Sequence, residues 1–233
     1  MLLLEERQAI THYSKKMQTT GLVQGTMGNI SLANDDKSLV AITPSGVVYE
    51  TMSPEDVVVV DKQGKVVDGS LLPSSEIGLH LALLYQRPEI KAVVHTHSDY
   101  STAMSCLRWD LPAVHYLIGK AGFTVPVAPY ATFGTQALAE RICETIGDGN
   151  AVFMANHGLV TVGESLKNAF STAEMVEFVA KLYLITKSVG TPAIIDRDEM
   201  KTVLKRFVTY GKQPAIRDHF SYLPGCGNHS QIR

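Results

Sequence analysis

Short apolar runs that end in tight turns alternate along this chain with longer amphipathic stretches, and this alternation constrains the fold more than any other feature of the sequence. The first half contains hairpin-forming pairs of strand-like runs, such as residues 30–32 with residues 38–42. From the buried run at residues 92–96 onward, strand-like and helix-like segments alternate. Hairpins combined with strand–helix alternation predict an α/β fold, a single three-layer domain with a mixed, largely antiparallel central sheet covered by helices.

Helix and turn signals set the expected boundaries of the elements. We expect helices at residues 2–20, 73–86, 135–146, 165–188 and 196–210, and one that begins after Ser98. Residues 53–56 also have the composition of a helix start. We expect strands at residues 30–32, 38–42, 57–61, 66–67, 92–96, 113–116, 124–128 and 151–155. The 233 residues fit one large domain. We place this domain at residues 1–211, followed by a C-terminal tail at residues 212–233 that contains Pro, Gly and polar residues.

The charge pattern limits the classes of partner. The formal net charge is -2 and Lys and Arg form no run, so a nucleic acid is a poor candidate partner. The N-terminus has no cationic stretch followed by a long apolar one, and no segment approaches the roughly 18 continuous apolar residues that span a bilayer. Three Cys without paired spacing do not form a disulfide framework. These features predict a cytoplasmic protein that acts on a small molecule.

Four side chains form a candidate metal site. His95 and His97 lie at the end of an apolar strand-like run, where residues two apart face the same way. The spacing of the pair alone is slightly better explained as two unrelated polar residues at a strand end. His157 ends another apolar run, and Glu76 lies in the first turn of an expected helix. Three imidazoles and a carboxylate suit Zn²⁺ with one exchangeable position, and other divalent ions remain compatible.

Two other histidines have weaker signals. His80 lies one helical turn after Glu76, and we assign it a structural role, with a place beside the metal ligands as the alternative. His115 is expected to point to the opposite strand face from Tyr116, and we assign it no chemical role.

Three turns rich in Gly, Ser and Thr form a candidate phosphate site, at residues 25–29, 43–46 and 70–75. Ser74 and Ser75 also lie at the start of an expected helix, where free backbone N–H groups and the helix dipole bind anions. Each turn taken singly is an ordinary turn. Hydroxyl and N–H donors would allow a small phosphorylated substrate to bind without a basic patch.

These motifs, taken in order along the chain, resemble those of the class II aldolase/adducin family. The resemblance extends from about residue 8 to residue 211 and is strongest with the members of the family that act on L-fuculose 1-phosphate. The stretches that carry it are Gly25-Thr26-Met27-Gly28-Asn29, Ile42-Thr43-Pro44-Ser45-Gly46, Leu72-Pro73-Ser74-Ser75-Glu76, Val93-Val94-His95-Thr96-His97, Ala113-Val114-His115-Tyr116, Ala128-Pro129-Tyr130-Ala131-Thr132-Phe133-Gly134 and Asn156-His157-Gly158-Leu159.

The resemblance implies a role for each matching residue. One Zn²⁺ per subunit would be held by His95, His97, His157 and Glu76. Glu76 would also act as the acid/base after the substrate displaces it from the metal.

The resemblance also implies a homotetramer with sites between subunits. Tyr116 would reach the aldehyde oxygen from a neighbouring subunit, and Tyr210 would close the site from the C-terminal segment. The phosphate pocket would be lined by Gly28, Asn29, Ser45, Gly46, Ser74 and Ser75.

The implied activity is zinc-dependent retro-aldol cleavage of L-fuculose 1-phosphate to dihydroxyacetone phosphate and L-lactaldehyde, a step of fucose metabolism. Related reactions stay open: a pentulose-5-phosphate 4-epimerase, a rhamnulose-1-phosphate aldolase or a thio-pentulose phosphate dehydratase would share the metal and phosphate sites. A non-catalytic, adducin-like binding module and a zinc hydrolase are further alternatives. Lys120 departs from the family pattern, which has a smaller apolar residue there, and lies on the expected aldehyde side of the pocket.

Overall fold

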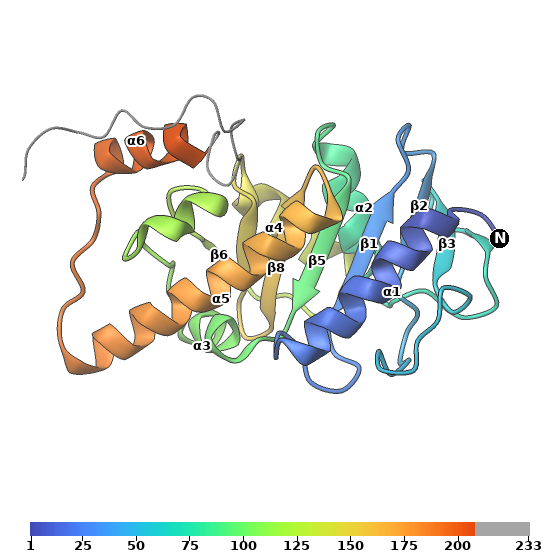
Figure 1. The fold of residues 1–233 in the computed structure, drawn as a ribbon, viewed down its shortest axis with the longest axis horizontal. Helices are drawn as coiled ribbons and strands as arrows, with labels where there is room; N and C mark the ends of the chain where they lie inside the picture. Colours follow the sequence, from blue (N-terminus) through green and yellow to red (C-terminus); the bar gives the residue numbers. More distant parts are fainter. Residues whose placement is uncertain (208–233) are drawn as a thin grey trace, which may run out of the picture.

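This computed structural model describes residues 1–207 of the chain. These residues fold around one eight-stranded sheet (Figure 1). Its strands are β1 (Asn29–Ala33), β2 (Leu39–Ile42), β3 (Val58–Asp61), β4 (Val66–Asp68), β5 (Ala92–Thr96), β6 (Val127–Ala128), β7 (Ala151–Met154) and β8 (Gly158–Gly163). Their order across the sheet is β4-β3-β2-β1-β5-β8-β7-β6. Neighbouring strands are antiparallel except for the parallel pair β6–β7. The predicted mixed, largely antiparallel sheet is therefore confirmed.

Helices cover both faces of the sheet and give the predicted three layers (Figure 1). One face is covered by α1 (Leu4–Thr19), α3 (Asp99–Leu107) and α5 (Leu166–Val189), and the other by α2 (Ile77–Gln86) and α4 (Gln136–Ile146). The short 3₁₀ helix η1 (Tyr116–Lys120) packs against α5 and α6 (Arg197–Phe207). Each face of the sheet has its own apolar core, because strand residues alternate between the two sides.

Two strand registers position the candidate site. The start of β1 pairs with the end of β5, with Asn29 opposite His95. The start of β8 pairs with the same end of β5, with Leu159 opposite Thr96. Both pairings are antiparallel, so the loops that precede β1 and β8 meet at the end of β5.

Two predicted elements are wrong. Residues 53–56 form a turn and not a helix start, since the Asp56 carboxylate accepts hydrogen bonds from the Ser53 backbone N–H (2.8 Å) and hydroxyl (3.0 Å). Residues 113–116 form no strand, because the chain turns into η1 there. The His115 imidazole accepts a hydrogen bond from the Leu117 N–H at 3.3 Å and caps that short helix.

Other differences concern one unpredicted strand and the ends of elements. Strand β8 was not predicted, although its Leu159-Val160-Thr161-Val162 run is mostly β-branched and buried. Glu76 lies at the N-cap of α2, one position before the first turn. The expected tail and Tyr210 lie outside the described residues, so the boundary at residue 211 stays a prediction.

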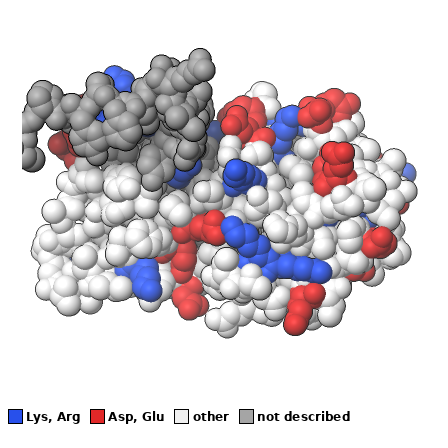
Figure 2. All heavy atoms as spheres, in the orientation of Figure 1, with Lys and Arg blue, Asp and Glu red and all other residues white. Residues whose placement is uncertain are grey.

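The visible surface carries charges of both signs. On the face shown in Figure 2, Lys and Arg are interspersed with Asp and Glu. In the helical layer, for example, Lys16 of α1 pairs with Glu174 of α5 at 2.9 Å. Within the described residues, the helices include none that is long and apolar enough to cross a membrane.

Candidate metal centre and adjoining cavity

Three imidazoles converge at the end of β5. His95 is the fourth residue of that strand, His97 follows its end, and His157 lies in the turn between β7 and β8. One nitrogen from each ring lies within 4.8 Å of the other two. The Nε2 atoms of His95 and His97 are 2.9 Å apart. The structure therefore brings together the three histidines that the sequence singled out.

Hydrogen bonding at His95 and burial at His97 and His157 favour ring nitrogens that are available to an ion. His95 is fully buried, and its Nδ1 donates to the Leu159 carbonyl at 2.9 Å, which leaves the Nε2 lone pair facing the other rings. Burial and the neighbouring imidazoles lower the pKa of His97 to about 3. Burial, followed by the effect of His95, lowers the pKa of His157 to about 4. Neutral imidazole is the form that binds a metal ion.

Glu76, the predicted fourth ligand, lies beside two of these rings. Its Oε2 lies 3.3 Å from His95 Nε2, and its Oε1 lies 3.6 Å from His157 Nε2. Burial alone would raise the pKa of Glu76, but His95, the amide of Asn29 and His157 together hold the pKa below its ordinary value. Oε1 is buried and has no hydrogen-bond partner among the described residues. A carboxylate beside the His95 and His157 nitrogens, with one buried oxygen that lacks a hydrogen-bond partner, fits a divalent cation.

Close backbone packing at Gly158 places His157. A Cβ at Gly158 would collide with the Thr96 carbonyl oxygen and come within 3.3 Å of the His95 ring. Glycine at this position therefore lets β8 approach β5 directly beside the metal centre.

Replacing Gly158 by Ala is expected to separate β8 from β5 and to weaken both the fold and metal binding. Inserting a methyl group into a packed site typically costs about 1–3 kcal/mol of unfolding free energy. Thermal unfolding and metal content after dialysis would measure the two effects. Gly190→Ala is the matched control, because a Cβ there meets no atom within 4 Å. Equal stability and metal content in the two variants would contradict the packing argument.

The candidate ligands open into a cavity of about 410 Å³. Glu76, His97 and His157 line it on one side. All six predicted phosphate-pocket residues line the same cavity, namely Gly28, Asn29, Ser45, Gly46, Ser74 and Ser75, and the remaining lining residues are Thr26, Met27, Pro44 and Phe133. None of these lining residues is Lys or Arg, so an anion in the cavity would be held by hydroxyl and N–H donors.

Backbone hydrogen bonds hold the turns of this cavity side by side. Pro44 and Pro73 form an isolated antiparallel bridge, in which the Ser45 N–H donates to Leu72 O at 2.9 Å and the Ser74 N–H to Thr43 O at 3.1 Å. Gly28 has φ +76°, and a Cβ there would lie 2.6 Å from the carbonyl oxygen of the buried His95. The turn before β1 therefore runs directly against the metal centre, as only glycine allows.

Tyr116, one of the two predicted tyrosines, does not line this cavity. Tyr116 begins η1, is 41% exposed and stacks against Phe207 of α6 at a ring distance of 6.2 Å. The Lys120 ammonium lies 5.9 Å from the same Phe207 ring, away from the cavity lining. Tyr210 lies outside the described residues.

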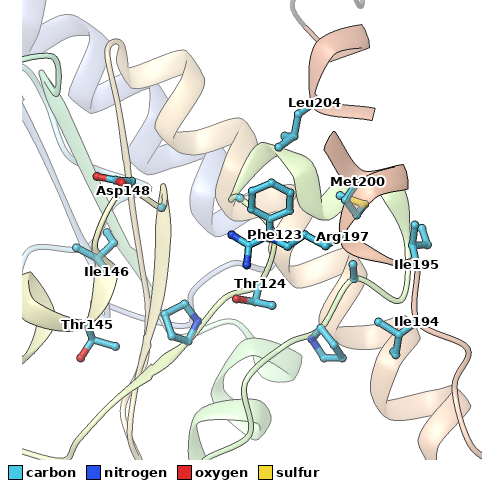
Figure 3. A pocket seen from close by; sticks show the side chains of 15 residues that line it. Phe123, Thr124, Thr145, Ile146, Asp148, Ile194, Ile195, Arg197, Met200 and Leu204 are labelled. Atoms are coloured by element: carbon cyan, nitrogen blue, oxygen red, sulfur yellow. The ribbon is translucent and has the colours of Figure 1, made fainter. Parts of the chain in front are cut away.

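A second cavity, of about 680 Å³, lies between α6 and the segments around residues 122–126 and 145–149 (Figure 3). It is lined mostly by apolar side chains, and the Arg197 guanidinium sits 5.0 Å above the ring of Phe123. None of the candidate ligands lines it, so the smaller cavity at the histidines is the candidate site.

The sequence favoured a structural role for His80 and left a place beside the metal ligands as the alternative. His80 is fully buried and binds the side chains of Ser31 and Asn29, and Asn29 in turn binds Glu76. The available signal was the spacing of His80 four residues after Glu76, which places both on one face of α2.

Known proteins are similar to this chain in both sequence and fold. The profile of the family described as Class II Aldolase and Adducin N-terminal domain matches residues 8–184. A 5-deoxy-D-ribulose 1-phosphate aldolase of Bacillus thuringiensis serovar kurstaki is 48% identical over 91% of this chain and all of its own length. An L-fuculose phosphate aldolase of Escherichia coli K12 is 40% identical over 84% of this chain and 91% of its own.

A solved structure of an L-fuculose 1-phosphate aldolase superposes with a TM-score of 0.85 at 42% identity, covering 88% of this chain and 96% of its own. The matched profile covers most of the chain, and it includes the candidate ligands His95, His97, His157 and Glu76. This chain belongs to the class II aldolase and adducin family.

Proposed function

We propose that this protein is a metal-dependent aldehyde-lyase that cleaves a deoxyketose 1-phosphate to dihydroxyacetone phosphate and a short aldehyde. The observation that carries the proposal is a single cavity with two kinds of lining. Three imidazoles and Glu76 suit a divalent ion, and the adjoining Ser- and Gly-rich turns suit a phosphate. Membership of the class II aldolase family supports the reaction class.

Two substrates deserve testing, because relatives are named for them. 5-Deoxy-D-ribulose 1-phosphate and L-fuculose 1-phosphate share a C1 phosphate, a C2 ketone, hydroxyls at C3 and C4, and a terminal methyl group. Cleavage between C3 and C4 would release acetaldehyde from the first and L-lactaldehyde from the second. We place the deoxyribulose compound first, since the relative named for it is 48% identical to this chain. L-Fuculose 1-phosphate, the expectation from sequence, comes second.

Zn²⁺ is the proposed ion, held by His95, His97, His157 and, in the resting site, Glu76. When bound, it would supply Lewis-acid chemistry by drawing electron density from the C2 ketone. The phosphate would be bound by Ser45, Ser74 and Ser75 and by the backbone N–H groups of the neighbouring turns.

Glu76 would move the proton at C3. In cleavage, the C4 hydroxyl loses its proton on the Tyr116 side, the C3–C4 bond breaks, and its electron pair stays on the dihydroxyacetone phosphate fragment as an enediolate. Glu76, once it has taken up a proton from water, delivers that proton to C3, so that one proton is gained at C3 for the one lost at C4. In the reverse direction Glu76 removes the C3 proton and Tyr116 supplies one to the aldehyde oxygen.

The test is release of dihydroxyacetone phosphate from each substrate by the zinc-loaded protein, followed by a coupled NADH assay with and without chelator. Release that the chelator abolishes supports both the reaction and its metal dependence. No release from either compound, by protein shown to hold zinc, would move the proposal to the epimerase or dehydratase alternatives. Protein that binds no zinc would contradict it and favour the adducin-like binding module.

Each active site would be shared between two copies of the chain in a homotetramer. Tyr116 is exposed on η1 and does not line the cavity that holds Glu76. An adjacent copy is therefore the proposed source of the Tyr116 hydroxyl.

Mixing two inactive variants tests this arrangement. Glu76→Gln and Tyr116→Phe are each expected to be slow. Because a shared site draws one residue from each copy, random mixed tetramers should regain about a quarter of wild-type activity. Unfolding and refolding the two variants together, followed by the NADH assay, measures this recovery. Refolding each variant alone is the control, and mixed samples no faster than the separate ones would show that each chain uses its own Tyr116.

A further inference from the structure

A buried chain of hydrogen bonds links the sheet to Glu76. Ser31 Oγ lies 2.6 Å from Nδ1 of His80, and His80 Nε2 lies 2.5 Å from Oδ1 of Asn29. The Asn29 amide nitrogen then donates to Glu76 Oε2 at 2.9 Å. Ser31 and Asn29 are two residues apart on β1, and Glu76 and His80 are one turn apart on α2. The chain therefore joins one face of β1 to one face of α2.

Donor and acceptor chemistry gives this chain a single direction. The Asn29 NH₂ group donates to Glu76 Oε2, so the Asn29 oxygen is the atom that faces His80. His80 must then carry its hydrogen on Nε2, and its Nδ1 must accept from the Ser31 hydroxyl. Each of the three hydrogen bonds from Ser31 to the carboxylate then has one donor and one acceptor. Reversing the Asn29 amide would place two acceptors against each other at Glu76.

The surroundings keep His80 in that form. Its side chain is fully buried between α2 and the sheet. Burial is the main reason that the pKa of His80 is lowered to about 3, so the ring is neutral near pH 7. A neutral ring has one donor and one acceptor, as the chain requires.

We propose that His80 is a positioning residue, which orients the Asn29 amide and through it holds Glu76 by Oε2, so that Oε1 is the oxygen presented to the metal and to the substrate proton. Oε1 is the buried oxygen of Glu76 that has no partner among the described residues, and it faces His157. The role in proton transfer rests on the proposed aldolase function, whereas the hydrogen-bond chain itself does not.

Two substitutions separate positioning from simple packing. His80→Phe fills the space but removes the donor to Asn29, and His80→Gln keeps an N–H donor near the Nε2 position. Thr161→Val is the matched control, since it removes a buried hydroxyl that donates to Ala169 O at 2.9 Å without touching the chain. Loss of a residue that orients a metal-site group typically lowers activity about 10- to 100-fold.

We expect kcat of the zinc-loaded His80→Phe protein to fall by about 10- to 100-fold with KM little changed and one zinc still bound. His80→Gln should recover most of kcat, and Thr161→Val should lose stability but keep kcat. Exchange of solvent deuterium into dihydroxyacetone phosphate should slow in parallel with kcat, because that half-reaction needs only the Glu76 proton transfer. A His80→Phe protein that matches Thr161→Val in kcat and exchange would overturn the positioning role.

A second readout does not depend on activity. In ¹⁵N-histidine-labelled protein, with the His80 signals assigned by their loss in His80→Gln, His80 should appear as the neutral Nε2–H tautomer. A neutral Nδ1–H tautomer would overturn the hydrogen-bond chain. If the wild-type protein neither cleaves the substrates nor exchanges deuterium, the proposed function and the proton-transfer role of Glu76 are contradicted. The tautomer of His80 would still test the hydrogen-bond chain.

Discussion

Replacing Glu76 by Gln is expected to slow turnover at least about a hundredfold, the usual scale for the loss of a general acid/base, while the bound metal is retained. Gln has nearly the shape of Glu and can still accept a hydrogen bond from the Asn29 amide, which donates to Oε2 in the native site. His95, His97 and His157 remain to hold the ion. The variant therefore removes the proton carrier and leaves the geometry.

The measurement is kcat together with zinc content per chain. Glu140→Gln is the control. Glu140 is an exposed glutamate on α4, and its side chain accepts a hydrogen bond from Gln136. Near-normal turnover of Glu76→Gln with full zinc would sink the assignment of Glu76 as the acid/base. Loss of zinc along with activity would show that Glu76 contributes mainly as a ligand.

Replacing His97 by Ala is expected to remove most of the bound metal and the activity with it. Four-ligand zinc sites bind with about 10–16 kcal/mol, or roughly 3 kcal/mol per ligand, so the loss of one imidazole should weaken affinity about a hundredfold or more. His97 is the suitable ligand to replace, because it follows β5 and is half-buried, whereas His95 is fully buried and its loss would also open the core.

Zinc content after dialysis and the dihydroxyacetone phosphate assay measure the effect. His12→Ala is the control, since His12 is exposed on α1 and contacts the ring of Tyr13 at 5.3 Å. Added zinc should restore part of the activity of His97→Ala if affinity is what was lost. Full zinc content and normal turnover in the variant would contradict the metal centre.

Local patterns in the sequence were enough for several features. Alternating apolar runs and turns predicted the three layers and the mixed sheet, because burial on one face requires a fixed periodicity. The two-residue spacing of His95 and His97 predicted that both rings face one side, and the structure has their Nε2 atoms 2.9 Å apart. The turns at residues 25–29, 43–46 and 70–75 were predicted to bind phosphate, since Gly and Ser provide N–H and hydroxyl donors, and residues of all three turns line one cavity.

Where the local signal was ambiguous, tertiary contacts decided. Residues 53–56 have a helix-start composition, yet the Asp56 carboxylate closes a turn on Ser53. Residues 113–116 are apolar enough for a strand, yet the His115 side chain caps a 3₁₀ helix instead. In both cases one side chain that accepts local hydrogen bonds, two at Asp56 and one at His115, outweighs a weak local propensity.

By itself, the sequence determined which residue types are present for metal and phosphate chemistry and which of them share a strand, a turn or a helix face. Only the tertiary structure decided which of these residues lie close together. Pairing of β8 with β5 brings His157 to His95 across 62 positions of sequence, and pairing of β1 with β5 places Asn29 opposite His95. The bond between His80 and Asn29 joins residues 51 apart. Such contacts depend on strand register and on helix packing over the sheet, which local periodicity does not specify.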